Sequence, residues 1–397
     1  MAKVAHIPVS GYVEPDFISA KAAPSFDLTL LLCPRCTLMQ LEDSGYMDII
    51  VKRVYSQYHA TYSLSGSVQA YMHNLLSEIH SQHSLGEDDL LLEVGCNDGK
   101  SLEIARNIPC KVLGVEPSSM LAATCLSHNI PVINGFFNVV VGKTVISEYG
   151  FPRILIVRHV LEHAYDLQQF IIGLKECMNP QSVLFIEVPY IVSILQGFHF
   201  EGIAHPHLYY FSVESLKSLL SHAGIGITSV KTVNTDGGSI LIQARLGQTT
   251  DKSLAPFLSL EYAIQTEVKS TYQLLSKRIE HRKKEVYRLL RILNRQGKRV
   301  YGFGAGKGHT ILNTLGLDSS LVQRVIDDDV AKQGMFLPGC GIEISSSQYL
   351  REEPPDYLIM LSPPHADELK TKIRARFPSR QFSFIDIIPE IVMEPAR

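Results

Sequence analysis

The chain has 397 residues, of which 45% are hydrophobic and 19% are charged, and its formal net charge is -3. A chain of this length is expected to contain two or three domains, and its composition is that of a globular protein rather than a disordered one. The near-neutral charge argues against nucleic acid or an acidic membrane as the partner. We therefore expect a small-molecule substrate.

The cellular compartment is indicated by what the sequence lacks. The first residues, Met-Ala-Lys-Val-Ala-His-Ile-Pro, contain no continuous apolar segment of the kind found in signal peptides. No stretch reaches the roughly 18 apolar residues that a membrane helix needs. Seven cysteines, most of them inside apolar runs, do not form a disulfide framework. These features predict a cytoplasmic protein.

The first half of the chain divides into two predicted domains. Residues 1–66 have few long apolar stretches and predict a small N-terminal domain, and a helix is expected over 67–80. Further on, strands are expected at 90–94, 111–115, 154–157, 183–188 and 239–245, and helices at 102–105, 118–128, 167–178 and 213–222. This alternation predicts a parallel sheet with helices on both faces, in a domain that spans residues 67–250.

A third domain is predicted over residues 251–397. The polar segment 247–252 marks its boundary, and one long helix is expected over 258–295. A smaller α/β unit follows, with strands at 299–303, 322–326 and 356–361, a glycine-rich turn over 302–308 and a helix over 310–315. A glycine-rich turn between a strand and a helix favours the binding of phosphate.

The most informative motif is Leu91-Leu92-Glu93-Val94-Gly95-Cys96-Asn97-Asp98-Gly99. A buried strand ends here in an acid, and the chain then turns at glycines that let the backbone approach a ligand closely. About twenty residues later, Glu116 ends the next predicted strand, and such a carboxylate can accept hydrogen bonds from both hydroxyls of a ribose. The glycines do not have the strict dinucleotide spacing, which counts against a nicotinamide enzyme.

This arrangement resembles motif I of class I methyltransferases that use S-adenosylmethionine (SAM). The resemblance implies a Rossmann-like central domain with SAM as the cofactor. The candidate cofactor-binding residues are Glu93, Gly95, Asn97, Asp98, Gly99, Glu116, Pro117 and His159.

Nearly the whole chain is similar to the C-methyltransferases that act on nucleotide-linked deoxysugars. The resemblance is carried by Cys33-Pro-Arg-Cys36, the Tyr58–Ser65 cluster, Glu93–Gly99, Gly237-Gly238-Ser239, Gly302–Gly308, Asp327–Asp329, Lys332–Gly334 and Leu337–Gly339. It implies an α/β protein with a small zinc-binding N-terminal domain, a SAM-binding middle domain and a second Rossmann-like domain at the C-terminus. The implied substrate is a nucleotide sugar.

The chemistry of that family assigns roles to individual residues. A keto sugar is deprotonated next to its carbonyl, and the resulting enolate attacks the methyl group of SAM, so the site needs a base and donors for the enolate oxygen. The candidate catalytic residues are His207, His163, His205 and Tyr58. The candidate substrate-binding residues are Tyr62, Gly304, Gly306 and Lys307, of which the last three would hold the diphosphate.

Two departures from the family leave alternatives open. The family motif Tyr-His-Glu-His is replaced here by Ala204-His205-Pro206-His207, so the base machinery is depleted. The methyl acceptor could then be an oxygen or a nitrogen, or the chain could be a binding scaffold that has lost catalysis. A structural zinc site usually has four ligands, but only Cys33 and Cys36 are present as a close pair. The pair is the candidate zinc site, and the alternative is a degenerate domain held by packing alone.

Overall fold

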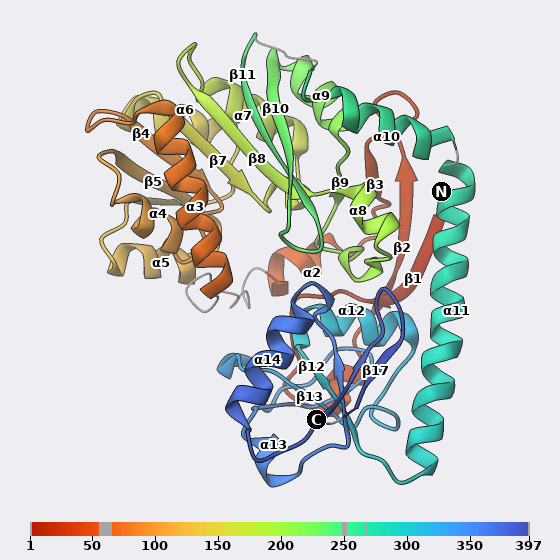
Figure 1. Ribbon diagram of the computed structural model, residues 1–397. Coiled ribbons are helices and arrows are strands. Elements are labelled where there is room, and N and C mark those ends of the chain that lie inside the picture. The colour runs from red at the N-terminus through yellow and green to blue at the C-terminus, as the bar shows by residue number, and fades with distance from the viewer. Residues whose placement is uncertain (1, 55–65, 248–251, 267, 396–397) are drawn as a thin grey trace.

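The computed structural model describes residues 2–54, 66–247, 252–266 and 268–395. Their strands form three sheets of four, seven and six strands. Figure 1 shows the seven-stranded sheet in the upper part of the molecule and the six-stranded sheet in the lower part, with helix α11 (Val268–Arg295) running down the right side, beside β1 and the lower part. Among the described residues, no helix has both the length and the apolarity needed to cross a bilayer.

The N-terminal sheet is antiparallel throughout and combines two distant parts of the chain. Its strands are β1 (Ala2–Pro8), β2 (Ser25–Leu32), β3 (Met39–Leu41) and β9 (Tyr209–Tyr210), with the short helices α1 (Phe17–Lys21) and α2 (Met47–Ile49) beside them. Because β9 pairs with β3, the sheet is not confined to residues 1–66. The division of the chain into three domains stays a prediction.

The central sheet has the strand order β10-β11-β8-β7-β4-β5-β6. Its strands are β4 (Leu90–Val94), β5 (Lys111–Glu116), β6 (Val132–Asn134), β7 (Ile154–Arg158), β8 (Val183–Pro189), β10 (Ile225–Val233) and β11 (Ser239–Leu246). Its helices are α3 (Gly66–His83), α4 (Lys100–Ala105), α5 (Ser119–Ser127), α6 (Val139–Tyr149), α7 (Leu167–Glu176), α8 (Ile191–Gln196) and α9 (Val213–His222). The predicted all-parallel sheet is wrong at one edge, where β10 and β11 pair antiparallel as a hairpin.

The interior strands of this sheet are apolar because helices cover both faces. Every residue of β4, β7 and β8 is buried, and each strand is a nearly continuous run of Leu, Ile, Val and Phe. Such runs are typical of parallel strands that contact helices above and below. Three charged residues break the pattern near strand ends, Glu93 in β4, Arg158 in β7 and Glu187 in β8, and all three contribute to the site described below.

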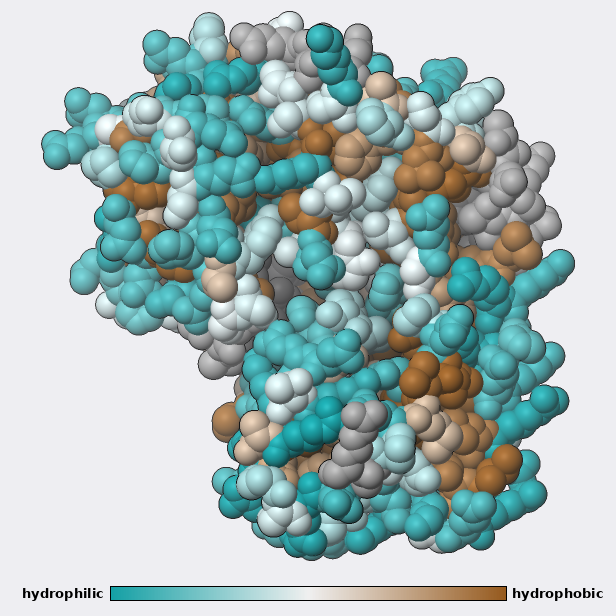
Figure 2. Space-filling model, in the orientation of Figure 1, coloured by the Kyte–Doolittle hydropathy of each residue, from teal (hydrophilic) through white to brown (hydrophobic). Residues whose placement is uncertain are grey.

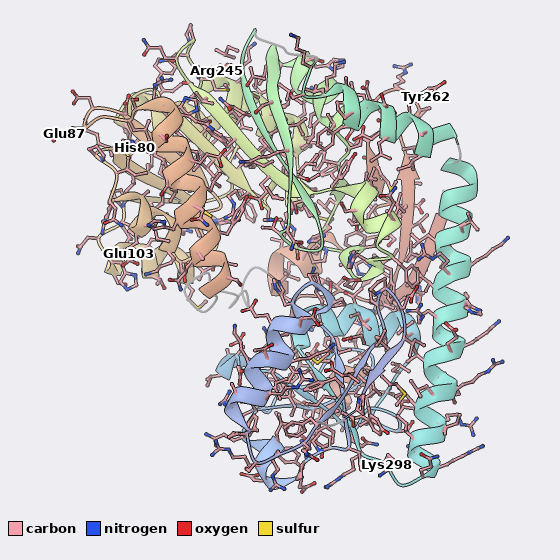
Figure 3. All side chains as sticks on the ribbon, viewed as in Figure 1. His80, Glu87, Glu103, Arg245, Tyr262 and Lys298 are labelled. Atoms are coloured by element: carbon pink, nitrogen blue, oxygen red, sulfur yellow. The ribbon has the colours of Figure 1, made fainter. Side chains whose placement is uncertain are left out.

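Two helices, rather than one, follow the central sheet in the described residues. They are α10 (Ala255–Thr266) and α11, so the helical region begins earlier than the predicted residue 258. Helix α11 buries an apolar stripe that includes Leu275, Ile279, Val286 and Leu290. Figure 3 shows nitrogen-tipped side chains pointing from its other side into solvent, as expected for an amphipathic helix.

The C-terminal unit, residues 300–394, is a second α/β fold. Its strands are β12 (Val300–Phe303), β13 (Arg324–Ile326), β14 (Ile344–Ser345), β15 (Tyr357–Met360), β16 (Ser383–Asp386) and β17 (Val392–Glu394), and its helices are α12 (Ala305–Leu315), α13 (Tyr349–Glu352) and α14 (Ala366–Arg376). All pairs are parallel except β16 with β17.

The predicted glycine-rich turn over Gly302–Gly308 is shorter than expected. Helix α12 begins at Ala305 instead of Thr310, and only Gly304, with φ of 102°, has a backbone conformation that favours glycine. Gly306 and Gly308 are therefore helical. The helix tolerates them because most of its other residues are buried and supply packing energy that outweighs glycine's low helix propensity.

The central sheet and the C-terminal unit meet at the turn of the β10–β11 hairpin. In Figure 1 this turn extends downward toward the C-terminal unit, and Figure 2 shows the surface hollowed between the upper and lower parts. Helix α12 also packs against residues Phe200–Gly202, which follow α8. Segments that come after the carboxyl ends of strands in both parallel sheets therefore meet at this junction, where open α/β sheets bind ligands.

Candidate functional site

The loop between β4 and α4 forms the first part of the site. Gly95, Asn97 and Gly99 have φ of 73°, 55° and 79°, so the chain passes through the left-handed region three times within five residues. Glu93 is buried before the loop and accepts a hydrogen bond from the Ser101 hydroxyl, and burial raises its pKa to about 7. Asn97 and Asp98 are also buried.

The carboxylate of Glu116 fixes this loop from the neighbouring strand. It accepts hydrogen bonds from the backbone N–H groups of Asn97 at 3.0 Å and Ser118 at 2.8 Å. The Asn134 amide donates to the carbonyls of Glu116 and of the half-buried Pro117. Burial raises the pKa of Glu116 to about 7 despite the two N–H donors. Each carboxylate oxygen keeps a second lone pair for hydroxyl donors.

The glycines of the loop lie where the protein leaves little room. A Cβ on Gly95 would lie 2.3 Å from Val160 Cγ2, and one on Gly99 would lie 2.7 Å from Ile130 Cδ1. The backbone therefore passes directly against neighbouring side chains on one side. A glycine loop at the end of β4, with an acid at the end of β5, fits the nucleoside part of SAM.

A charged network that the sequence did not reveal lies beside this loop. Glu187, at the end of β8, accepts hydrogen bonds from Arg158 Nε at 2.8 Å, Tyr71 Oη at 2.8 Å and Thr235 Oγ1 at 2.6 Å. Its other contact is His159 Nε2 at 3.0 Å. The only local signal for Glu187 was a single acid inside a buried apolar strand, and none of its partners could be read from spacing.

His159 has the buried environment of a charged histidine. Its φ of 51° is left-handed, and its Nδ1 lies 3.5 Å from Glu162 Oε1. Burial alone would lower its pKa, but the carboxylates of Glu162 and Glu187 raise the pKa to about 10. The structure therefore places this predicted cofactor-binding residue in the wall of the site as a fixed cation.

The two histidines expected to move protons lie together. The rings of His163 and His207 have centroids 4.8 Å apart, in an edge-to-face arrangement. His163 Nδ1 lies 2.6 Å from the Pro206 carbonyl, and His207 Nδ1 lies 2.9 Å from the Gly202 carbonyl. Because carbonyls only accept, both Nδ1 atoms donate, which leaves each Nε2 free to accept a proton.

Buried Glu162 completes this cluster. One ligand atom from each of Glu162, His163 and His207 lies within 4.8 Å of the others, so the three groups could hold a metal ion as well as a proton. Neither carboxylate oxygen of Glu162 has a hydrogen-bond partner, although His159 lies within ion-pair distance. Burial raises the pKa of Glu162, but the nearby His159 and the other histidines around the carboxylate bring it below its usual value.

His205 does not lie in this cluster, and its catalytic role stays a prediction. It is fully buried against the N-terminal sheet, with its ring centroid 4.8 Å from Tyr46 and 6.2 Å from Phe26. The histidines before and after Pro206 therefore face different neighbours. The predicted residues Tyr58 and Tyr62 lie outside the described residues.

Lys307, predicted to bind the substrate at the start of α12, already has a partner in the structure. Lys307 Nζ lies 2.5 Å from Asp236 Oδ1, in the turn between β10 and β11, so its ammonium group has a carboxylate partner. Gly304 precedes the helix, and a Cβ on Gly306 would meet nothing within 4 Å. The first turn of α12 is therefore open at Gly306.

The carboxyl end of β13 repeats the geometry found at Glu116. Asp327 accepts hydrogen bonds from the Ala305 N–H at 2.7 Å and the Asp329 N–H at 2.9 Å. In both units, the acid at the carboxyl end of the second strand thus accepts two hydrogen bonds. One comes from a backbone N–H in the segment that follows the first strand, and the other comes from the N–H two residues after the acid itself. Asp327–Asp329 carried part of the family resemblance in the sequence, but no role was predicted for it.

Cys33 and Cys36 lie at the turn between β2 and β3, half-exposed, and both are free thiols. The backbone N–H groups of Cys36 and Arg35 lower the pKa of Cys33. In the part of the chain that the structure describes, no third His, Cys, Asp or Glu joins them at ligand distance. Two thiolates without further ligands do not fit a structural zinc.

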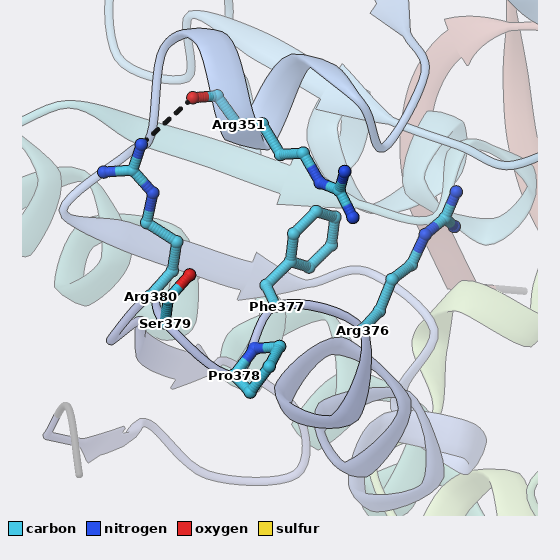
Figure 4. Close-up of a pocket in the computed structure, with 6 residues that line it drawn as sticks. All are labelled: Arg351, Arg376, Phe377, Pro378, Ser379 and Arg380. Carbon is cyan, nitrogen blue, oxygen red and sulfur yellow. Dashed lines mark hydrogen bonds between the residues drawn. The ribbon is translucent and has the colours of Figure 1, made fainter.

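A separate hollow of about 380 Å³ lies on the C-terminal unit, away from these residues. Figure 4 shows Arg351, Arg376 and Arg380 around Phe377, with Arg380 donating to the Arg351 carbonyl at 3.2 Å. Arg376 also forms an ion pair with Asp328 at 2.9 Å. The residues that line this hollow include none of the predicted site residues, so we do not assign cofactor or substrate binding to the hollow.

Comparisons with known proteins cover nearly the whole chain. Residues 68–230 match the family model of a methyltransferase domain, and residues 234–389 match that of a C-methyltransferase C-terminal domain. The chain is 30% identical over 366 residues to the C-methyltransferase NovU of Streptomyces niveus, covering 91% of this chain and 86% of that protein.

Among solved structures, a SAM-dependent methyltransferase from Archaeoglobus fulgidus aligns with a TM-score of 0.34 at 19% identity, over 41% of this chain and 71% of that one. Magnesium protoporphyrin IX methyltransferase from Synechocystis PCC 6803 aligns with a TM-score of 0.35 at 14% identity, over 45% of this chain and 82% of that one.

Proposed function

Because this chain belongs to the family of SAM-dependent C-methyltransferases, we propose that its acceptor is a nucleotide-linked keto-deoxysugar. Three predictions are confirmed by the family: the chain is an enzyme, its cofactor is SAM, and its central sheet has the class I methyltransferase fold. The alternatives of O-methylation, N-methylation and a non-catalytic scaffold give way to methylation of carbon.

The observation that carries the acceptor assignment is the repeated geometry of Glu116 and Asp327. The first carboxylate, with the Gly95–Gly99 loop, suits the ribose of SAM. The second lies beside Gly304 and the first turn of α12, in the same relation to its own strand and helix. Two carboxylates held in this way are suited to two nucleoside ligands, and a nucleotide sugar is the second ligand that a sugar methyltransferase needs.

The diphosphate of that substrate would lie at the start of α12. The N–H groups in the first turn of this eleven-residue helix have no carbonyl partner within the helix, and the helix dipole favours negative charge there. Gly304 and Gly306 keep the approach open. Lys307 adds positive charge nearby, although its ammonium group is already paired with Asp236.

Bound SAM supplies an electrophilic methyl group on a sulfonium. The chain must therefore generate a carbon nucleophile, and we assign that step to His207. Its neutral Nε2 removes the proton next to the sugar carbonyl, and the electron pair left on that carbon forms the enolate that takes the methyl group. Burial and the charge of His163 lower the pKa of His207 to about 4, so the ring is neutral and able to accept a proton at physiological pH.

Glu162 takes the place of the acid missing at position 206. Its buried carboxylate lies in the same cluster as His163 and His207 and stabilises the imidazolium formed when His207 accepts a proton. At position 204, the family's tyrosine is absent, and the Tyr210 hydroxyl lies 3.2 Å from the Ala204 backbone nitrogen.

Two measurements test this function. With SAM, a thymidine- or uridine-diphosphate 4-keto-deoxysugar should gain one methyl group, located on carbon by NMR. Without methyl transfer, in heavy water and with the demethylated cofactor bound, the enzyme should exchange the proton next to the carbonyl for deuterium. Failure of both, with any keto-deoxysugar nucleotide in a panel of ring positions, would refute the proposal.

A further inference from the structure

The ion pair of Lys307 with Asp236 joins the two ligand-binding parts of the molecule. Asp236 belongs to the central sheet's last hairpin, whereas Lys307 belongs to the first turn of α12 in the C-terminal unit. In the described ranges, it is the one ion pair found between residues 66–247 and residues 300–395. Its two side chains are only 30% and 24% exposed, which reduces screening by solvent.

The backbone around Asp236 is held in one conformation. Asp236, Gly237 and Gly238 have φ of 53°, 89° and 112°, so three successive residues are left-handed. A Cβ on Gly238 would lie 2.7 Å from Ser193, and one on Gly237 would lie 3.4 Å from both His199 and Pro364. Pro364 belongs to the C-terminal unit, so the turn fits tightly against both parts.

The residues next to Asp236 connect it to the donor side of the site. Thr235 donates to Glu187 at 2.6 Å, and Glu187 contacts His159 at 3.0 Å. The turn is closed by hydrogen bonds from the Gly238 N–H and the Ser239 hydroxyl to the Thr235 carbonyl. Movement of Asp236 is therefore coupled to the network beside the SAM loop.

Lys307 is connected to the acceptor side in a similar way. It follows Gly304 in the turn assigned to the diphosphate, and α12 packs against Phe200–Gly202. The Gly202 carbonyl fixes Nδ1 of His207. The charges of Asp236 and Lys307 also act on His207 in opposite directions, the first raising its pKa and the second lowering it.

From these contacts we infer that Asp236 and Lys307 are positioning residues, whose ion pair holds the acceptor-binding unit at the distance from the donor that methyl transfer requires. This inference rests on the proposed function. Transfer needs the nucleophilic carbon and the methyl group within about 3–3.5 Å of each other in near-linear alignment, and an error of about 1 Å can cost a hundredfold in rate. A half-buried ion pair between the two units is suited to prevent that error.

The role differs from direct capture of the diphosphate by Lys307. If Lys307 binds the diphosphate through its ammonium group, Lys307→Met raises KM for the nucleotide sugar, and Asp236→Asn leaves kcat unchanged. If the pair positions the two units, both substitutions lower kcat. Asn tolerates the left-handed conformation of Asp236, so Asp236→Asn removes charge without adding backbone strain.

The experiment measures kcat and KM for the Asp236→Asn, Lys307→Met, Lys307→Arg and double variants. We expect a drop in kcat of about 10–100-fold for each neutral single variant, an equal drop for the double variant, and retained activity for Lys307→Arg. SAM affinity should stay within about twofold. The matched control is Lys231→Met, which removes an exposed ion pair with Glu78 inside the central unit and should leave kcat unchanged.

Small-angle X-ray scattering gives a readout that does not depend on the acceptor. Asp236→Asn and Lys307→Met should increase the radius of gyration, and Lys231→Met should not. An unchanged radius together with unchanged kcat would overturn the inference, as would additive losses in the double variant. If wild type methylates no nucleotide sugar but the radius still changes, the proposed acceptor is wrong and the positioning contact stands.

Discussion

The carboxylate of Glu116 binds two backbone N–H groups of the protein, and we propose that it also accepts hydrogen bonds from both hydroxyls of the SAM ribose. Burial raises its pKa to about 7, above the usual value for glutamate. At pH 8 the group is ionised and accepts all four hydrogen bonds, whereas below pH 7 it carries a proton and loses acceptor capacity. SAM binding should therefore strengthen as the pH rises through 7.

Glu116→Gln should remove this pH dependence and weaken SAM binding about tenfold, since a hydrogen bond to a charged group contributes roughly 1.5–3 kcal/mol. Titration calorimetry between pH 5.5 and 8.5 measures both effects. Glu103→Gln on the surface of α4 is the control and should behave as wild type. An affinity that is flat with pH in wild type would contradict the assignment.

His207→Gln should lower kcat by about 10²–10⁴-fold, which is the usual contribution of a general base, and leave SAM affinity unchanged. Deuterium exchange into the keto sugar should fall by the same factor. His222→Gln, at the exposed end of α9, serves as the control for loss of a histidine. Normal exchange in the His207 variant would assign the base to another residue.

Among single residues, the sequence predicts those that lie close in the chain to the loop they contact. Glu93, Gly95 and Glu116 could be found because a strand, a turn and an acid follow one another in the chain. Glu187 and Asp236 could not, since their partners are 28 or more residues away, as with His159 and Lys307. The separation of His205 from His207 could not be predicted, because the sequence does not show that the chain turns at Pro206 and sends the flanking side chains apart.

The β4–α4 loop is the element in which backbone conformation limits sequence most strongly. A methyl group on Gly95 meets Val160 at 2.3 Å and is placed on a left-handed residue. Gly95→Ala should destabilise the protein by about 2–4 kcal/mol, combining backbone strain with the steric clash.

Gly45 provides the matched control for this prediction. It also has a positive φ, of 91°, but a Cβ there would meet nothing within 4 Å. Gly45→Ala should therefore cost only the backbone strain, about 1 kcal/mol. Chemical denaturation measures both variants, and equal losses would show that Val160 moves aside.

Helices and strands were predicted well where apolar runs are long. They were predicted poorly where contacts between distant parts of the chain determine the secondary structure. The five strands expected in the central sheet all exist, because each is a buried run with turn residues at its ends. The central-sheet strands β6 and β10, the four strands of the N-terminal sheet, and β14, β16 and β17 of the C-terminal sheet were missed, since most of them are short or lack a continuous apolar run. Helix α12 was started too late because its glycines resemble a turn when read without their buried neighbours.

For the whole molecule, the proposed binding of SAM on one sheet and of the nucleotide sugar on another predicts that the two ligands bind together. The demethylated cofactor and a nucleoside diphosphate should each raise the thermal unfolding midpoint, and their effects should add. At 100 times its Kd, each ligand contributes about 2.7 kcal/mol. Differential scanning fluorimetry with each ligand alone and with both together measures the shift of the midpoint. The same sugar without its nucleotide is the control. A combined shift no larger than either alone would mean that the two ligands compete for one crevice.

The strand β9 has a consequence for how the chain is made. It completes the N-terminal sheet but lies between β8 and α9, so β3 leaves the ribosome long before the strand that covers its edge. Until then β3 is an unpaired edge that other nascent chains can join. Synthesis that pauses before Tyr209 therefore leaves the first sheet of the protein incomplete, with the edge of β3 waiting for a strand that the chain has not yet supplied.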